Sequence, residues 1–300
     1  MIVNQAALAN VYVGLSAVFN AAFQEAPEPW YTRLAMTVPS TGRSMDYKFL
    51  LDYPGMREWV GDRVIRSLEG KNWIVENRDY EITIGVERND IEDDQLGLYN
   101  PLVAQMALEA KLHPNRLIAD LIKGGGAAPC YDGQYFFDTD HPVGEGTASN
   151  FSSGGSTPWY LFDVSRPVKP FIFQLRKPVQ LTRMDRPDDE HVFMRKQFRF
   201  GVDGRYAAAY GLWQLAYKST QTLTASSYAA ARAAMMGFSN ADGRKLGVTP
   251  NLLVVPPSLE ATAREILNAD IIIGDPTAGG AKTNVWRGSA DLLVVPELAD

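Results

Sequence analysis

Cysteine is nearly absent from this chain of 300 residues, which contains Cys130 alone. A single cysteine excludes an intramolecular disulfide framework and favours synthesis in a reducing, intracellular compartment. Histidine is also rare, with His113, His141 and His191 as the only three. No HExxH or CxxC spacing occurs, so the common zinc-binding motifs are missing.

The chain has no excess of positive charge. Its 29 Lys and Arg residues are outnumbered by 35 Asp and Glu residues, which gives a net charge of −6 and a pI of about 5.2. A dedicated nucleic-acid reader normally has a basic face, so this class is disfavoured, although a container whose inner surface tolerates DNA is not excluded. The length and the 46% hydrophobic content fit a soluble globular protein with one large domain or two modest ones.

The N-terminal region is apolar but matches no targeting segment. The first cation is Arg33, so the positive region of a secretory signal is missing. Polar residues, among them Asn10 and Asn20, interrupt the run too often for a membrane span. Apolar residues recur at helical spacing over Leu8–Ala22, which predicts an amphipathic helix that ends before Pro27. This helix either packs on its own domain or forms an arm that packs on a neighbouring subunit.

The stretch from Met45 to Asp94 is charged and β-patterned, with little that could form a core of its own. Two strands are predicted, Val64–Leu68 and Asn72–Val75, joined by a tight turn at Gly70. A two-stranded arm is marginal in water by itself, so we expect its partner to be another molecule. Aromatic and arginine residues are enriched at interfaces. The residues expected between subunits are Arg57, Glu58, Trp59, Arg63, Arg66 and Trp73, together with Tyr12 and Phe19 of the N-terminal helix.

A long helix is predicted from Asn100 to Lys123, with Asn100 as its N-cap and Pro101 in its first turn. At ~1.5 Å per residue it would span about 36 Å, a long strut for a chain of this size. Pro114 should kink or break it, because proline removes a backbone donor and clashes with the preceding turn. Upstream, Tyr80–Glu87 alternates apolar and polar residues, which indicates a strand with one wet face.

The second half predicts an antiparallel sheet followed by helices and short strands. The expected sheet strands are Pro170–Gln180, Val192–Val202 and Arg205–Tyr217, with a hairpin turn at Gly201–Gly204. Helices are expected at Thr224–Met236 and Ser258–Asn268, and a hairpin at Gly274–Lys282. The similar segments Asn251–Pro256 and Asp291–Pro296 predict two short buried strands of one sheet.

One group of residues has the types needed for chemistry. Cys130, His141 and the acids Asp132, Asp138 and Asp140 lie close in sequence, and either a Cys–His nucleophile pair or a metal site could be built from them. The favoured interpretation is a structured turn, capped by Asp side chains and anchored by two Phe rings.

Two further patterns favour structural roles. The acidic run Asp90, Glu92, Asp93 and Asp94 lacks the spacing and the glycine of a calcium loop. It is interpreted as the solvated approach to the long helix, where negative charge is favourable. Gly124–Gly126 is followed by no Lys-Ser/Thr pair and predicts no phosphate loop. The sequence therefore predicts no catalytic residue, no cofactor and no metal.

Eight segments, in this order along the chain, resemble the major head (capsid) subunit family of Mu-like tailed bacteriophages. They are Glu58–Arg63, Asn77–Arg88, Asp90–Gly97, Tyr131–Asp138, Asp140–Pro142, Val168–Gln174, Tyr210–Gln214 and Lys245–Pro256. Any one of them is weak, but eight in the same order are specific. The resemblance covers the chain from Met1 to Asp300.

The resemblance implies the Hong Kong 97-type capsid fold. This is an α+β fold in which an N-terminal arm and an extended β-hairpin, the E-loop, reach across neighbouring subunits. Residues 1–39 would form the arm and 40–80 the E-loop. Residues 81–222 would form a peripheral domain with the spine helix (100–123) and the antiparallel sheet. Residues 223–300 would form an axial domain with a C-terminal strand.

The function implied by the resemblance is that of a major capsid protein and not of an enzyme. Such a virion protein self-assembles into pentamers and hexamers of an icosahedral head and encloses double-stranded DNA without sequence specificity. Assembly is expected in the host bacterial cytoplasm, with separate scaffold or protease and portal proteins, with decoration proteins left open, and without a membrane. Two rivals stay open: an encapsulin-like cellular compartment for protein cargo, and an enzyme that uses Cys130 and His141.

Overall fold

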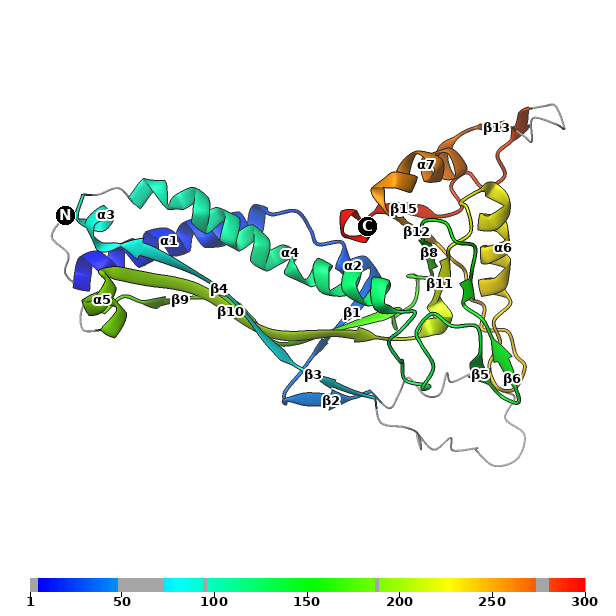
Figure 1. Ribbon diagram of the computed structural model, residues 1–300, viewed down its shortest axis with the longest axis horizontal. Helices are drawn as coiled ribbons and strands as arrows, with labels where there is room; N and C mark the ends of the chain where they lie inside the picture. The colour runs from blue at the N-terminus through cyan, green and yellow to red at the C-terminus, as the bar shows by residue number, and fades with distance from the viewer. Residues whose placement is uncertain (1–4, 48–72, 94–95, 187–188, 274–280, 300) are drawn as a thin grey trace.

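The computed structural model describes residues 5–47, 73–93, 96–186, 189–273 and 281–299. The molecule is elongated: two long helices and long strands form one end, and a more compact body with shorter strands forms the other (Figure 1). The helices are α1 (Gln5–Glu25), α2 (Tyr31–Leu34), α3 (Arg88–Glu92), α4 (Asn100–Gly124), α5 (Glu190–Arg195), α6 (Ala225–Met236) and α7 (Glu260–Asn268).

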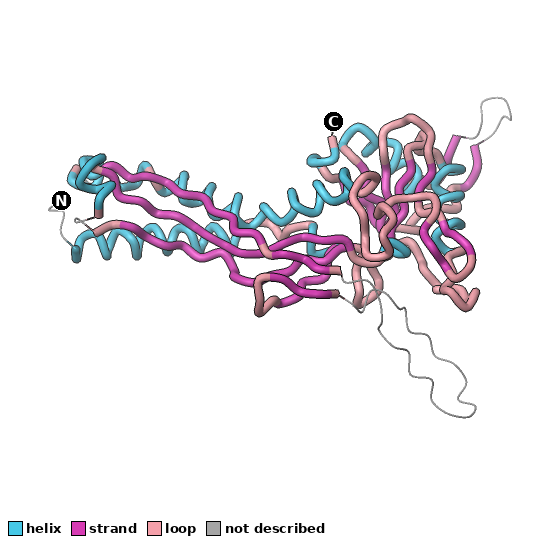
Figure 2. The backbone as a smooth tube through the Cα atoms, turned by 60° about the horizontal axis from the view of Figure 1, so that its bottom comes forward, coloured by secondary structure: helices cyan, strands magenta, loops and turns pink. Residues whose placement is uncertain are grey.

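The long end is built on a four-stranded sheet with the order β1-β9-β10-β4. Its strands are β1 (Ala35–Pro39), β4 (Arg78–Glu87), β9 (Phe171–Met184) and β10 (Gln197–Tyr210). β1 runs parallel to β9, whereas β10 is antiparallel to both β9 and β4. Helices α1 and α4 run lengthwise along this sheet, as the tube view also shows (Figure 2).

Two apolar cores follow one another along the molecule. The tip core, at the far end of the sheet, includes Leu15 of α1, Val86 of β4, Met106 of α4 and Phe200 of β10. The main core includes Ile118 of α4 and Tyr206 of β10 and continues into the compact body. Strand β4 alternates as predicted, with Ile84 and Val86 buried and Thr83 and Glu87 exposed, because only one face of the sheet meets the helices.

The compact body contains a five-stranded sheet with the order β15-β12-β8-β11-β7. Its strands are β7 (Phe151–Ser152), β8 (Trp159–Phe162), β11 (Ala216–Ser219), β12 (Leu252–Val255) and β15 (Asp291–Val294). The two similar segments lie in one sheet as predicted, where β12 and β15 are parallel neighbours. β12 is buried as expected, whereas β15 is only partly buried. Helices α6 and α7, both predicted, lie beside this sheet (Figure 1).

Three short antiparallel pairs complete the described strands. They are β2 (Ser44–Asp46) with β3 (Ile74–Glu76), β5 (His141–Val143) with β6 (Gly146–Ala148), and β13 (Ile271–Ile273) with β14 (Ala281–Thr283). The last pair corresponds to the hairpin predicted at Gly274–Lys282, although residues 274–280 and the predicted strand Val64–Leu68 lie outside the described residues.

The turn predicted at Gly201–Gly204 is wrong. β10 runs from Gln197 to Tyr210 without turning back, and a register shift beside Arg205 takes up the irregularity. Both glycines serve close packing. A Cβ on Gly201 would lie 2.9 Å from Thr83 Oγ1, and one on Gly204 would lie 3.0 Å from a carbon of Tyr206. A side chain at Gly201 would collide with Thr83 of β4, and one at Gly204 with Tyr206 of its own strand and Val179 of β9.

The bounds of two other predicted strands also need correction. The strand predicted from Val192 starts as helix α5, which reverses the chain between β9 and β10 and ends at Lys196 in the left-handed region, with φ 53°. The strand predicted over Arg205–Tyr217 divides between β10 and β11, which belong to different sheets. Gly211 permits this change of sheet, because a Cβ there would lie 2.5 Å from the Lys169 carbonyl oxygen.

Helix α4 confirms the predicted long helix with two corrections. Tyr99, and not Asn100, is the N-cap, and the helix continues through Pro114, so the predicted break is wrong. Proline inside a helix costs about 3 kcal/mol, but tertiary contacts hold the helix on both sides of it. Asn115 Oδ1 accepts a hydrogen bond from Tyr31 N at 2.9 Å. The Lys111 ammonium donates to Ala26 O at 2.7 Å.

Helix α1 packs on its own chain. Leu8, Val11, Leu15 and Phe19 recur at helical spacing and are buried in the tip core, which agrees with the first of the two interpretations drawn from the sequence. Residues Ala6–Glu25 are long and apolar enough to cross a membrane by length and composition, a property that core helices of globular proteins share. Here the apolar stripe of the helix is occupied by contact with the rest of the subunit.

We expect Leu15→Ala to lower the free energy of unfolding of the unassembled subunit by about 2–5 kcal/mol, because removing a buried leucine leaves a cavity. Val13→Ala is the matched control on the outer side of α1, where Val13 is 65% exposed; it should change stability by less than about 0.5 kcal/mol. Urea unfolding measures both. Small, equal effects would contradict packing of α1 on its own chain.

Candidate assembly site

The paired strands β2 and β3 flank residues 48–72, the centre of the predicted interface. Five predicted interface residues lie outside the described residues: Arg57, Glu58, Trp59, Arg63 and Arg66. Trp73 is described and half-buried, and its indole Nε1 donates a hydrogen bond to Tyr210 O at 3.2 Å. Trp73 therefore holds the end of this segment on the main body of its own subunit.

The two predicted interface residues of α1 contact their own chain. The Tyr12 hydroxyl donates to Leu181 O at 3.1 Å, and the Arg183 guanidinium lies 4.6 Å from the centre of the Tyr12 ring. Phe19 is buried in the tip core and stacks on Phe23 with ring centres 5.9 Å apart. Tyr12 thus covers a backbone acceptor at the edge of β9, which protects that edge from unwanted pairing.

Several exposed apolar side chains were missed by the sequence analysis. Phe193 of α5 is 82% exposed and its neighbour Met194 is similarly open, and both lie at the tip of the long end. Val285, which follows β14 at the opposite end, is 77% exposed. Large apolar groups this open often belong to interaction surfaces. Phe193 and Met194 stand side by side among charged residues, which was the available signal in the sequence.

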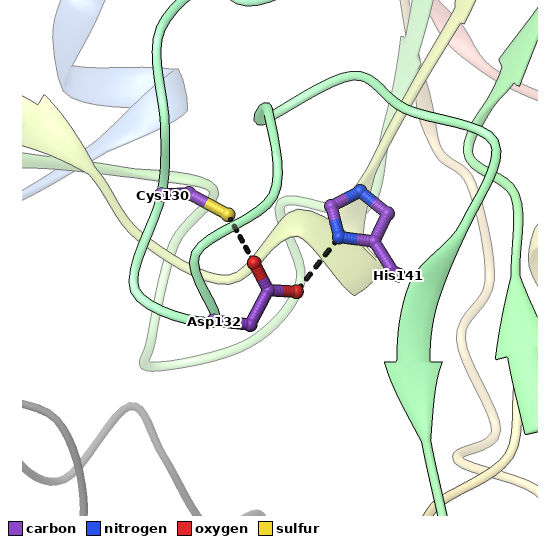
Figure 3. A group of neighbouring side chains, drawn as sticks. All are labelled: Cys130, Asp132 and His141. Atoms are coloured by element: carbon purple, nitrogen blue, oxygen red, sulfur yellow. Dashed lines mark hydrogen bonds and ion pairs between the residues drawn. The ribbon is translucent and has the colours of Figure 1, made fainter. Parts of the chain in front are cut away.

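A second candidate group gathers three of the residues singled out for chemistry (Figure 3). The Cys130 thiol donates to Asp132 Oδ1 at 3.0 Å, and His141 Nδ1 lies 2.7 Å from Asp132 Oδ2. The Asp132 carboxylate thus lies between the sulfur and the imidazole (Figure 3). Asp138 and Asp140 are not part of this cluster; Asp138 caps the backbone N–H groups of Tyr135 and Thr139, as predicted for the structured turn.

The imidazole of His141 is held from both sides of its ring. Its Nε2 lies 3.2 Å from Asn150 Oδ1, and the amide of Asn150 donates to Phe136 O at 2.8 Å, so Oδ1 must be the acceptor. The two ring nitrogens of His141 therefore lie beside oxygen atoms of Asp132 and Asn150. The imidazole is completely buried and stacks on Trp213, with ring centres 4.0 Å apart.

This cluster is a hydrogen-bonded structural unit. The three potential ligand atoms lie within 4.8 Å of one another, but each of them already has a hydrogen-bond partner within the cluster. Burial, and secondly the charge of Asp132, raise the pKa of the Cys130 thiol far above its usual range. A thiol that stays protonated is a poor nucleophile and a poor metal ligand. The favoured structured turn therefore fits the geometry better than the nucleophile or the metal site.

The chain matches the family described as Mu-like prophage major head subunit gpT over residues 8–298. It belongs to this family. The function of this head subunit is that of a major capsid protein, a structural component of the virion.

Two curated relatives agree with this assignment. The major capsid protein of Escherichia phage Mu is 38% identical over 309 aligned residues, covering 99% of this chain and 100% of that protein. The Mu-like prophage FluMu major head subunit of Haemophilus influenzae is 36% identical over 280 residues, covering 89% of this chain and 91% of that one. The family resemblance drawn from the sequence is confirmed.

Solved capsid structures share the fold of this head subunit. The subunit of the bacteriophage JBD30 procapsid superimposes with a TM-score of 0.84 at 36% identity, over 98% of this chain and 100% of that chain. The subunit of the JBD30 capsid decorated with minor capsid protein trimers gives a TM-score of 0.77 at 28% identity, over 91% and 92%. The predicted α+β fold of the Hong Kong 97-like capsid type is therefore confirmed.

The Asp132 carboxylate should make the head subunit sensitive to acid. Burial raises the pKa of Asp132, but hydrogen bonds from His141, Cys130 and the Gln134 amide outweigh it, so the pKa is lowered overall. Its stabilising effect is then present above the unfolded-state value of about 3.9 and is lost as the pH falls through the folded value. We expect Asp132→Asn to flatten the decline in unfolding free energy between about pH 5 and pH 3. Asp140→Asn, which removes an exposed carboxylate, is the control and should show the same decline in unfolding free energy as the wild-type protein. An equal decline in the wild-type protein and both variants would contradict a stabilising role of Asp132.

The buried thiol should resist alkylation. We expect iodoacetamide at about pH 8, close to the ordinary thiol pKa, to leave Cys130 unmodified in the folded subunit and to modify it after unfolding in urea. Mass spectrometry of the intact protein measures both states. Rapid alkylation of the folded subunit would restore Cys130 as a candidate nucleophile.

Proposed function

We propose that this head subunit forms pentamers and hexamers that close into an icosahedral head. The observation that carries the proposal is the near-complete superposition on the subunit of the bacteriophage JBD30 procapsid. The elongated shape supports it, since apolar side chains such as Phe193 and Val285 are exposed at opposite ends. A subunit that offers contacts at several distant points can bind many neighbours at once.

We further propose that residues 1–39 act as an N-terminal arm and residues 40–80 as an E-loop between subunits. The long end serves as the peripheral domain, and the compact body, whose five-stranded sheet joins strands from both sides of residue 222, serves as the axial domain. Arg57, Glu58, Trp59, Arg63 and Arg66 supply the interface residues of the E-loop, with Trp73 at its base. Tyr12 and Phe19 contact their own chain and are left out of the proposed interface. Each contact is modest by itself. Many contacts made together raise the effective concentration and give a cooperative shell.

The head encloses double-stranded DNA without reading its sequence. The net charge of −6 supports a shell that encloses DNA without binding it tightly, because tight binding requires many phosphate contacts from Lys and Arg. Assembly takes place in the host bacterial cytoplasm with separate scaffold or protease and portal proteins. Minor capsid protein trimers decorate the JBD30 capsid, and an equivalent decoration of this head is part of the proposal, whereas catalysis and a membrane are not.

Negative-stain electron microscopy tests the proposal. The subunit is expressed alone and together with the neighbouring genes of its operon. We expect closed shells or hexamer rings, with DNA inside shells recovered from infected or induced cells. Shells filled with one enzyme and no DNA would favour the encapsulin-like compartment, and a monodisperse monomer under all conditions would overturn assembly.

The E-loop residues provide a second test. We expect the double substitution Trp59→Ala and Arg63→Ala to leave a soluble, folded subunit that makes no shells, because aromatic and arginine anchors carry much of the energy of an interface. Circular dichroism verifies folding, and sedimentation verifies the loss of shells. Val13→Ala with Asp140→Asn, two exposed changes outside residues 40–80, is the control and should assemble normally. Wild-type shell yield from the Trp59/Arg63 variant would contradict the assigned E-loop interface.

A further inference from the structure

Tyr47 and Trp73 flank residues 48–72 and are held close to each other by hydrogen bonds. Tyr47 N donates to Trp73 O at 2.9 Å, and Trp73 N donates to Asp46 Oδ1 at 3.1 Å. The strands behind them, β2 and β3, pair over only three residues each. So short a two-stranded ribbon is marginal by itself, so something else must fix its register and direction.

A chain of buried polar side chains lies behind this ribbon. Tyr47 is 1% exposed, Asn77 8% and Gln174 0%. The Tyr47 hydroxyl donates to Gln174 Oε1 at 2.8 Å, and Gln174 Nε2 donates to Asn77 Oδ1 at 2.8 Å. Asn77 Nδ2 then donates to the buried Ser40 Oγ at 3.0 Å. The chain links β2, the end of β3 and strand β9 of the main sheet.

The direction of every hydrogen bond in this chain is determined. Gln174 Nε2 also faces Val75 O at 3.3 Å, and Asn77 Nδ2 faces Gly42 O at 2.9 Å. Carbonyl oxygens only accept, so both amide groups must present their nitrogen to them. Tyr47 must then be the donor to Gln174, and burial raises the pKa of Tyr47 to about 12, which keeps that proton in place. All donors point the same way, an arrangement in which hydrogen bonds strengthen one another.

The polar chain also fixes the register in which β2 and β3 pair. Gln174 contacts the backbone of Val75 in β3, while Asn77 contacts the backbone of Gly42 and, at 3.3 Å, of Arg43 just before β2. A slip of one residue in either strand would leave these buried groups without partners, at about 1–3 kcal/mol each. In several proteins buried polar groups specify one arrangement in this way.

We propose that Tyr47, Asn77 and Gln174 are positioning residues for assembly, whose hydrogen-bonded chain fixes the register and orientation of the stem formed by β2 and β3, between which residues 48–72 lie in the sequence. This inference rests on the proposed role of that segment as the E-loop between subunits. The three residues themselves need not touch a neighbouring subunit. Their effect on the shell passes through the orientation of the stem formed by β2 and β3.

Two substitutions with matched controls test the proposal. Tyr47→Phe removes one donor, and Gln174→Met removes the central link at similar volume. The controls are Tyr131→Phe and Gln214→Met in the compact body, where the Tyr131 hydroxyl donates to Gln214 Oε1 at 2.9 Å. They lose the same kind of tyrosine–glutamine bond, but neither residue belongs to the stem or to the polar chain behind it. Urea unfolding of the unassembled proteins first establishes which variants are matched in stability.

Two readouts separate the outcomes. Hydrogen exchange of the amides in β2 and β3 should be several-fold faster in Tyr47→Phe and Gln174→Met than in the controls. Electron microscopy should show open or irregular shells for these two variants and closed shells for the controls. If Gln174→Met fails to fold, Tyr47→Phe alone decides both readouts.

The positioning role would be overturned if the amides of β2 and β3 exchanged at the wild-type rate in both variants. It would also be overturned if variants with faster exchange in β2 and β3 still formed closed shells of wild-type size. Absence of shells from the wild-type protein itself would instead overturn the proposed function. In that case the exchange readout still decides whether the polar chain holds the stem. The failure of the inference and the failure of the proposed function are therefore distinguishable.

Discussion

The packing of helix α4 against strand β10 is the contact on which the rest of the subunit depends. Both elements enter both apolar cores: Met106 and Phe200 lie in the tip core, and Ile118 and Tyr206 lie in the main core. One helix and one 14-residue strand thus join two cores into a single elongated body. Pro114 and the register shift near Arg205 both fall between the cores, where irregular backbone disturbs the least apolar packing.

Because α4 and β10 join the two cores, the main sheet can support the short stem formed by β2 and β3. β9 supplies Gln174 from the centre of the main sheet, where it is paired with Val38 of β1 on one side and Ala207 of β10 on the other. The polar chain from Tyr47 to Ser40 is therefore anchored on a strand that cannot shift by itself. The hydrogen-bonded cluster of Cys130, Asp132 and His141 has a similar structural task in the compact body.

The sequence predicted the elements whose pattern is local. The alternation in β4 and the apolar stripe of α4 follow from side-chain periodicity, and the similarity of two short segments predicted that β12 and β15 share a sheet. It failed where tertiary contacts override local preference: packing holds α4 through Pro114, and close strand contact explains Gly201 and Gly204. Tyr47, Asn77 and Gln174 could not have been found together, because they are joined only by the fold, across 127 and 97 residues of chain.

A cryo-electron microscopy reconstruction of the shell formed by this chain tests the account most directly, because it shows where residues 48–72 lie relative to their own stem. The account predicts that Trp59 and Arg63 contact a neighbouring subunit, while Tyr47, Gln174 and Asn77 keep their hydrogen bonds in every copy. A shell in which this segment folds back on its own subunit, with neighbours joined only through other surfaces, would contradict it.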